Sequence, residues 1–158
     1  MELLIRAGGD VNAAPLLDLN EAYGAERRTA LQAAAQHGYL DMVRLLLEAG
    51  AEVERSSISE DEEGTALQFA AMSGSIAIVN ELIQRGANVN AGPMGENGRT
   101  ALEGAAEHGR LDMVQLLLNL EAEVRGSRAL QFAREEGHDG VAMLLLQNGF
   151  EDDVGMSG

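Results

Sequence analysis

The stretch that decides the fold is residues 29–50, which read TALQAAAQHGYLDMVRLLLEAG. Its opening tetrad, Thr-Ala-Leu-Gln, returns unchanged at residue 65 and with one change each at residues 100 and 128. Two alanines follow in the first three units, at 34–35, 70–71 and 105–106, and every unit then has a glycine, at Gly38, Gly74, Gly109 and Gly137. Glycine readily takes the left-handed conformation that ends a helix, so each tetrad predicts a short helix and its stop. The chain is therefore built from internal repeats.

A second helix is predicted after each of these glycines. Apolar residues recur there at spacings of three and four, the pattern of a helix with one buried face. We expect that face to contain Leu40, Val43, Leu46, Leu47, Ile76, Val79, Leu82, Ile83, Leu111, Val114, Leu117 and Leu118. Gly50 and Gly86 end the first two of these helices, and Glu121 stands where the third such glycine is expected. One unit is thus a helix, a turn, a second helix and an extended turn.

These units resemble the ankyrin repeat, whose hallmarks are Thr-Pro-Leu-His, two alanines, a glycine, a leucine-rich helix and Gly-Ala-Asp-Val-Asn. The variant tetrad is similar to repeats of large fungal ankyrin arrays. The resemblance implies an all-α ankyrin-repeat solenoid with about four repeats and an N-terminal half repeat. We expect one domain over residues 1–150, followed by an acidic disordered tail at 151–158. The expected parts of the domain are a half repeat at 1–13, an insertion at 14–26, and repeats at 27–63, 64–97, 98–126 and 127–150.

The amino end of such a solenoid exposes apolar surface unless something covers it. Leu16 and Leu17 lie in the insertion, and we expect them to fold back over Leu3, Leu4 and Ile5. The alternative is that the chain is a fragment of a longer array.

Composition excludes several classes of function. The chain has 158 residues, no cysteine and a formal net charge of −15, and all eleven basic residues are arginine. Thiolate nucleophiles, cysteine-based zinc sites and lysine Schiff bases are therefore absent, and a polyanion such as nucleic acid would be repelled. No apolar run is long enough to span a membrane, and the first residues do not resemble a signal peptide. We expect a cytoplasmic or otherwise intracellular protein that contacts neither membrane nor nucleic acid.

The resemblance also implies that variable residues on the concave face of the solenoid bind a partner. The candidate partner-binding residues are Arg28, Gln36, His37, Met72, Ser73, Arg99, Glu107, His108, Glu135 and Glu136, with Gly64 and Ser127 in the same columns. Arg28 and Arg99 could each clamp a carboxylate of the partner with two hydrogen bonds. They could equally form ion pairs with acidic neighbours in the chain. We expect a noncatalytic protein-protein interaction module that needs no cofactor and no metal.

Two other functions stay open. One is a small-molecule pocket or an enzymatic site that uses Glu103, Glu107 or His108. Glu103 replaces the glutamine of the tetrad one helical turn before Glu107, and two close carboxylates can have separated pKa values. The plainer interpretation is that Glu103 accepts local hydrogen bonds while Glu107 faces water. The other function is self-association, as part of a larger regulatory array.

The histidines give little support to a catalytic or metal site. His37 and His108 occupy the same column two repeats apart, too far from each other to share a metal. His138 is expected to have a structural role.

Overall fold

A computed structural model describes residues 9–13, 28–55, 64–93, 98–124 and 128–149. These ranges contain eight helices and no strand, so the predicted all-α fold is confirmed. The helices are α2 (Ala30–Gln36), α3 (Leu40–Glu48), α4 (Ala66–Ser73), α5 (Ile76–Gln84), α6 (Ala101–Glu107), α7 (Leu111–Asn119), α8 (Ala129–Glu135) and α9 (Asp139–Gln147). The expected cap of Leu16 and Leu17 and the expected tail lie outside the described residues.

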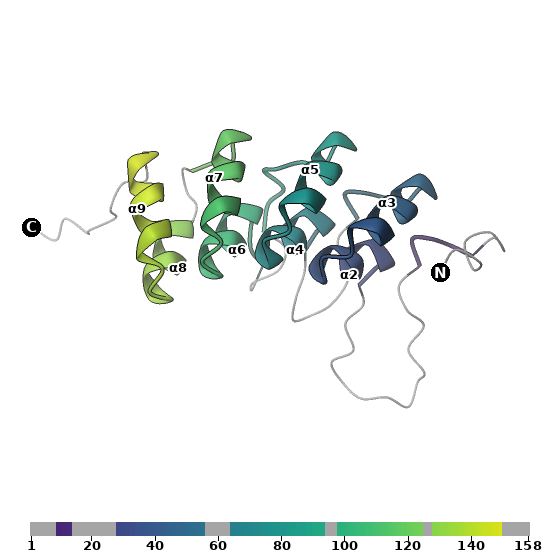
Figure 1. The fold of residues 1–158 in the computed structure, drawn as a ribbon, viewed down its shortest axis with the longest axis horizontal. Helices are drawn as coiled ribbons and strands as arrows, with labels where there is room; N and C mark the ends of the chain where they lie inside the picture. The colour runs from purple at the N-terminus through teal and green to yellow at the C-terminus, as the bar shows by residue number, and fades with distance from the viewer. Residues whose placement is uncertain (1–8, 14–27, 56–63, 94–97, 125–127, 150–158) are drawn as a thin grey trace, which may run out of the picture.

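The helices form four antiparallel pairs that stack into an elongated array (Figure 1). We call the pairs α2–α3, α4–α5, α6–α7 and α8–α9 repeats one to four. The first helices α2, α4, α6 and α8 contact one another in order and form one row, while α3, α5, α7 and α9 form a second row beside it. Among the described residues, none of the helices is long and apolar enough to cross a lipid bilayer.

Three of the four first helices begin at the threonine of the tetrad. Thr29, Thr65 and Thr100 are extended N-cap residues, and each hydroxyl accepts from the backbone N–H three residues ahead. The side chain at that later position, Gln32, Gln68 or Glu103, accepts in return from the threonine N–H. This reciprocal pair of bonds is a capping box, and it fixes where each helix starts.

Alanines let the first helices approach closely. Ala35, Ala71 and Ala106 occupy the same position in repeats one to three, and each is 0% exposed. A larger side chain there would hold the neighbouring helix away, because protein interiors have little spare volume.

The second helices bury most of their predicted face. Val43, Val79 and Val114 are fully buried, as are Leu82 and Leu117. The prediction was wrong at the first position of α5 and α7, because Ile76 is 39% exposed and Leu111 is 46% exposed, while Leu40 at the first position of α3 is half-buried against the core. That position directly follows the turn, at the outer edge of the stack. The sequence pattern also missed two buried residues in this row, Ile78 and Met113.

In repeats three and four, the residue after the inter-helix glycine joins its repeat to the repeat before it. Arg110 lies against Gly74, and its Nε donates to the carbonyl of Met72 at 3.1 Å. His138 lies against Gly109, and its Nε2 donates to the carbonyl of Glu107 at 3.0 Å. Both side chains thus bind carbonyls at the C-terminal end of the preceding first helix, where carbonyls have no partner within the helix itself.

Glu121 follows the second helix of repeat three in place of a glycine. It is the one described non-glycine residue with positive φ, at 62°, and it takes the place that Gly50 and Gly86 hold in repeats one and two.

Hydrogen bonds link neighbouring extended turns to one another. The side-chain carbonyl of Asn12 accepts from the Glu52 N–H at 2.8 Å, and the side-chain carbonyl of Asn90 accepts from the Glu123 N–H at 2.7 Å.

Two glycine substitutions separate backbone strain from loss of packing between repeats. Gly109 and Gly137 both have positive φ, at 66° and 73°. A Cβ at Gly109 would lie 2.6 Å from Nδ1 of His138, whereas a Cβ at Gly137 meets nothing within 4 Å. We expect Gly137→Ala to cost about 1–2 kcal/mol from the left-handed conformation alone. Gly109→Ala should cost at least about 1 kcal/mol more, because the His138 ring must move away from the Glu107 carbonyl.

Urea denaturation of both variants measures this difference. Equal free energies of unfolding for Gly109→Ala and Gly137→Ala would show that the contact between His138 and Gly109 contributes nothing to stability.

Candidate binding surface

Eight of the ten candidate partner-binding residues lie at the C-terminal ends of the first helices, whereas Arg28 and Arg99 precede these helices. Because these helices stack in order, their ends form one line along the array (Figure 1). We call this line the first-helix row, and it contains Gln36, His37, Met72, Ser73, Glu107, His108, Glu135 and Glu136. His37, His108, Glu135 and Glu136 are exposed, and the other four are half-buried. The row is thus accessible in every repeat.

Arg28 does not offer the exposed clamp that the sequence suggested. Its side chain is buried, and the residue is only 4% exposed. Nη1 donates to the side-chain carbonyl of Gln36, and the guanidinium carbon lies 4.5 Å from the centre of the Phe69 ring. A cation over an aromatic face is attracted by the ring quadrupole. Arg28 therefore joins repeat one to repeat two and presents little surface to a partner.

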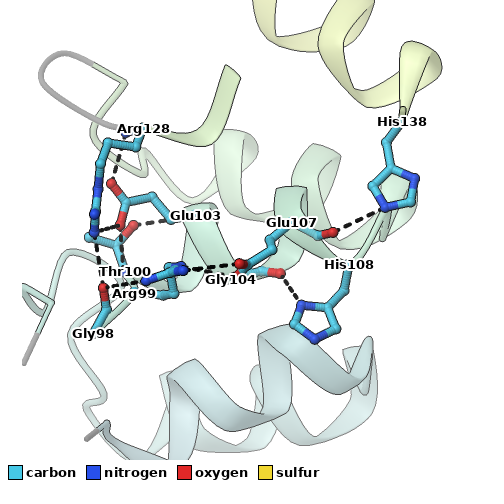
Figure 2. A network of polar contacts seen from close by, with 9 residues as sticks. All are labelled: Gly98, Arg99, Thr100, Glu103, Gly104, Glu107, His108, Arg128 and His138. Atoms are coloured by element: carbon cyan, nitrogen blue, oxygen red, sulfur yellow. Dashed lines mark hydrogen bonds and ion pairs between the residues drawn. The ribbon is translucent and has the colours of Figure 1, made fainter. Parts of the chain in front are cut away.

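Arg99 does form a two-bond clamp, but on a carboxylate of its own chain. Its Nε donates to Oε2 of Glu107 at 2.9 Å and its Nη2 donates to Oε1 at 3.0 Å. Figure 2 shows the two side chains lying between helix α6 and the loop before it. The guanidinium also lies 4.2 Å from the centre of the Phe132 ring in repeat four. Of the two interpretations of Arg99, the internal ion pair is the one that the structure contains.

These contacts alternate along the array. An arginine of repeat one covers a phenylalanine of repeat two, and an arginine of repeat three covers a phenylalanine of repeat four. Between repeats two and three the positions change: Gly64 replaces the arginine and Gly104 replaces the phenylalanine. Met72 takes up the space that Gly104 leaves, with its Cγ 2.5 Å from where a Cβ would be. Part of the Met72 side chain is therefore used within the stack.

Glu103 is buried, at 3% exposed, and both of its oxygens accept backbone hydrogen bonds. Oε2 accepts from the Thr100 N–H at 3.1 Å, and Oε1 accepts from the Arg128 N–H at 2.8 Å (Figure 2). The Arg128 guanidinium lies 3.6 Å from Oε2 and donates to the Gly98 carbonyl at 3.0 Å. Glu103 therefore caps its own helix and also holds the start of repeat four.

The proposed acid/base pair of Glu103 and Glu107 gains no support from this geometry. Glu103 accepts local hydrogen bonds, as the plainer interpretation had it, and its oxygens face backbone N–H groups. Glu107 differs from that interpretation, because Arg99 holds its carboxylate instead of water alone. Each carboxylate thus has its own partner, and the two do not share a proton site.

His108 presents one ring nitrogen to solvent. Its Nδ1 lies 3.0 Å from the Gly104 carbonyl, so Nδ1 carries the proton and donates (Figure 2). In the neutral ring, Nε2 is then a hydrogen-bond acceptor that a partner can reach. Within the described ranges, no three histidine or carboxylate side chains lie close enough to hold a metal ion.

Sequence reasoning missed an exposed aromatic side chain beside the row. Tyr39 is 62% exposed and its ring stacks on that of His37, with the ring centres 5.8 Å apart. Repeat one therefore offers an aromatic surface at its end of the first-helix row. The signal was available, because a tyrosine directly after the helix-ending glycine has no core position to fill.

Replacing Glu103 with glutamine tests its double role. In Glu103→Gln, one of the two acceptors becomes an amide donor that faces the N–H of Thr100 or of Arg128, so one buried N–H loses its partner. We expect a loss of about 1–3 kcal/mol in the free energy of unfolding, measured by urea denaturation. Glu48→Gln is the matched control, because Glu48 is exposed on α3. A loss no larger than that of the control would contradict the assignment.

The sequence was also compared with models of known protein families. The family model for ankyrin repeats matches in three copies, over residues 1–93, 54–125 and 90–155. Together these matches cover almost the whole chain and agree with the stacked helix pairs of the structure. Ankyrin repeats generally serve as protein-protein interaction modules. The chain belongs to the ankyrin-repeat family.

Proposed function

We propose that the chain is a noncatalytic module that binds a partner protein along the first-helix row. One observation carries this proposal: the row is exposed or half-exposed in every repeat, while its residues differ from one repeat to the next. Stacking needs the buried alanines and capping residues, which hardly change over repeats one to three. The variable residues are therefore the ones through which a partner can be selected.

The length of the row fits a segment of another protein. Packed helices lie roughly 10 Å apart, so four first helices place their ends along about 30 Å. Each repeat contributes one or two side chains to this line. Such a surface favours an extended segment or the edge of a helix over a compact small molecule.

The charges of the row give it two different ends. Arg28 is buried and Arg99 is bound to Glu107, so neither supplies an accessible positive charge. Repeat four instead presents the exposed carboxylates of Glu135 and Glu136. We propose that basic groups of the partner lie at repeats three and four, where the acceptor nitrogen of His108 also favours a donor.

Repeats one and two supply the less polar end. The stacked rings of His37 and Tyr39 offer a flat surface of the kind that aromatic hot spots use. Met72 is half-buried and flexible, so it can adapt to an apolar side chain. The proposed partner segment thus has apolar groups at one end and basic groups at the other. We place this interaction inside the cell.

Alanine substitutions on and off the row test the proposal. The test variant changes His37, Met72, His108 and Glu136, and the matched control changes Asp41, Asn80, Gln115 and Asp139, which are exposed on the second helices. Affinity capture from the source extract identifies a binding protein, and its affinity for both variants is then measured by calorimetry. We expect the test variant to bind at least tenfold more weakly, a loss of about 1.4 kcal/mol or more, and the control to bind as the parent does.

Circular dichroism must show that both variants keep the helix content of the parent. Equal affinity of the test variant and the parent would exclude the first-helix row as the binding surface.

Salt dependence tests the charged end separately. We expect Glu135→Gln with Glu136→Gln to slow association and to flatten its dependence on salt concentration, because rim charges act mainly on the rate of encounter. Surface plasmon resonance at several salt concentrations measures both effects. An unchanged salt dependence would contradict the placement of basic groups at repeat four.

A further inference from the structure

One set of three positions recurs wherever two neighbouring repeats meet, and we call each such contact a joint. The set consists of the residue before the tetrad, a residue near the C-terminal end of the same first helix, and the residue that the next repeat places opposite them. The sets are Arg28, Gln36 and Phe69 at the first joint, Gly64, Met72 and Gly104 at the second, and Arg99, Glu107 and Phe132 at the third. The second joint thus differs from the other two at all three positions.

At the first and third joints, an arginine side chain lies between two repeats. Its guanidinium donates to the polar residue of its own first helix, Gln36 or Glu107, and lies over the phenylalanine ring of the next repeat. Mild two-electron oxidants act on cysteine and methionine, and none of these side chains is either. These two joints are therefore chemically inert toward such oxidants.

At the second joint, Met72 is the only one of the three residues that has a side chain. Its Cγ lies 2.5 Å and its Sδ lies 3.4 Å from the position that a Cβ on residue 104 would take. The thioether thus lies directly on the backbone of α6, where the other joints have an arginine over a ring. Met72 is also half-buried, so solvent reaches part of the residue. An oxidisable sulfur atom is in this way part of the contact between repeats two and three.

We propose that Met72 is an oxidation site and that its conversion to the sulfoxide loosens the joint between repeats two and three. A lone pair of Sδ attacks one oxygen of hydrogen peroxide, so that an S–O bond forms while the O–O bond breaks. The leaving hydroxide takes the proton of the transferred oxygen and departs as water. Sulfur is oxidised by two electrons and the peroxide is reduced by two. Methionine sulfoxide reductases reverse this type of modification.

Two effects of the added oxygen weaken the joint. A sulfoxide is polar, so burying it against α6 without a hydrogen-bond donor costs free energy. The Met72 side chain also lies in close contact with Gly104 already, so an additional atom forces it outward and leaves the space over Gly104 empty. The bond from Arg110 to the Met72 carbonyl does not involve the thioether, so the joint is weakened and not broken. This effect is independent of the proposed binding function.

The other described methionines provide internal comparisons. Met143 is 62% exposed on α9, so it should react faster than Met72, with little effect on stability because most of it is already in water. Met113 is 1% exposed on α7 and should react most slowly. Met42 is half-buried against the core, so its contribution must be separated from that of Met72 by substitution.

Controlled oxidation of the full chain tests the proposal. The parent, Met72→Leu and the matched control Met143→Leu are treated with hydrogen peroxide, and peptide mass spectrometry measures the sulfoxide at each methionine. Leucine has nearly the volume of methionine and has no sulfur, so Met72→Leu keeps an apolar contact with Gly104. Circular dichroism gives the melting temperature of each protein before and after treatment.

We expect Met72 to be oxidised in the parent, and the melting temperatures of the parent and Met143→Leu to fall by about 4 °C or more. The same treatment should lower the melting temperature of Met72→Leu by less than about 2 °C. Met72→Gln tests the joint without an oxidant. Its polar side chain copies Gln36, but Gly64 stands in place of the arginine that binds Gln36, so it should lower the melting temperature as oxidation does.

Any of four results would overturn the proposal. Met72 could stay unoxidised while Met143 is fully converted, or its full oxidation could leave the melting temperature of the parent unchanged. The shift could be equal in the parent and in Met72→Leu, which would place its cause at another methionine. Finally, Met72→Gln could be as stable as the parent, which would show that the joint tolerates a polar side chain at this position.

Discussion

Close contact between neighbouring first helices is the constraint on which the rest of this structure depends. Helices of seven to nine residues are too short to be stable alone in water. Each repeat must therefore bury its face against the next one, and the distance is set by Ala35, Ala71 and Ala106. Because the helices are this close, a longer side chain next to these alanines must either contact the next repeat or point into solvent.

The arginines before the tetrads illustrate the effect of this constraint. Arg28 and Arg99 look like surface residues in the sequence, since each precedes a helix and carries a charge. In the folded array, the guanidinium of each arginine lies over the ring of a phenylalanine in the next repeat. Partial desolvation strengthens a cation-aromatic contact, so the charges of Arg28 and Arg99 lie in the contacts between repeats and not on the first-helix row. The accessible remainder of the row is a neutral, partly aromatic end and an acidic end.

The sequence predicted those features that depend on a few neighbouring residues. The short first helices and their stops at Gly38, Gly74, Gly109 and Gly137 were predicted, because each depends on residues that are close in the chain. The burial of Arg28 was not readable, because it depends on which residue the next repeat places opposite. The exposure of Ile76 and Leu111 was missed for a related reason: a helical periodicity marks a face, but it does not say where the neighbouring element ends.

The third tetrad has Glu103 where the others have glutamine, and this difference in side-chain chemistry fixes which repeat can follow repeat three. Gln32 and Gln68 donate to carbonyls of the turn ahead, so the turn ahead must present acceptors. Glu103 can only accept while it is ionised, and repeat four meets it with the N–H and the guanidinium of Arg128, where the earlier repeats have a threonine. If repeat two followed repeat three, the Glu103 carboxylate would meet an interface built for an amide, and a buried carboxylate would lose its donors. Repeat four is therefore matched to repeat three alone. This matching places the acidic residues Glu135 and Glu136 at a fixed end of the row.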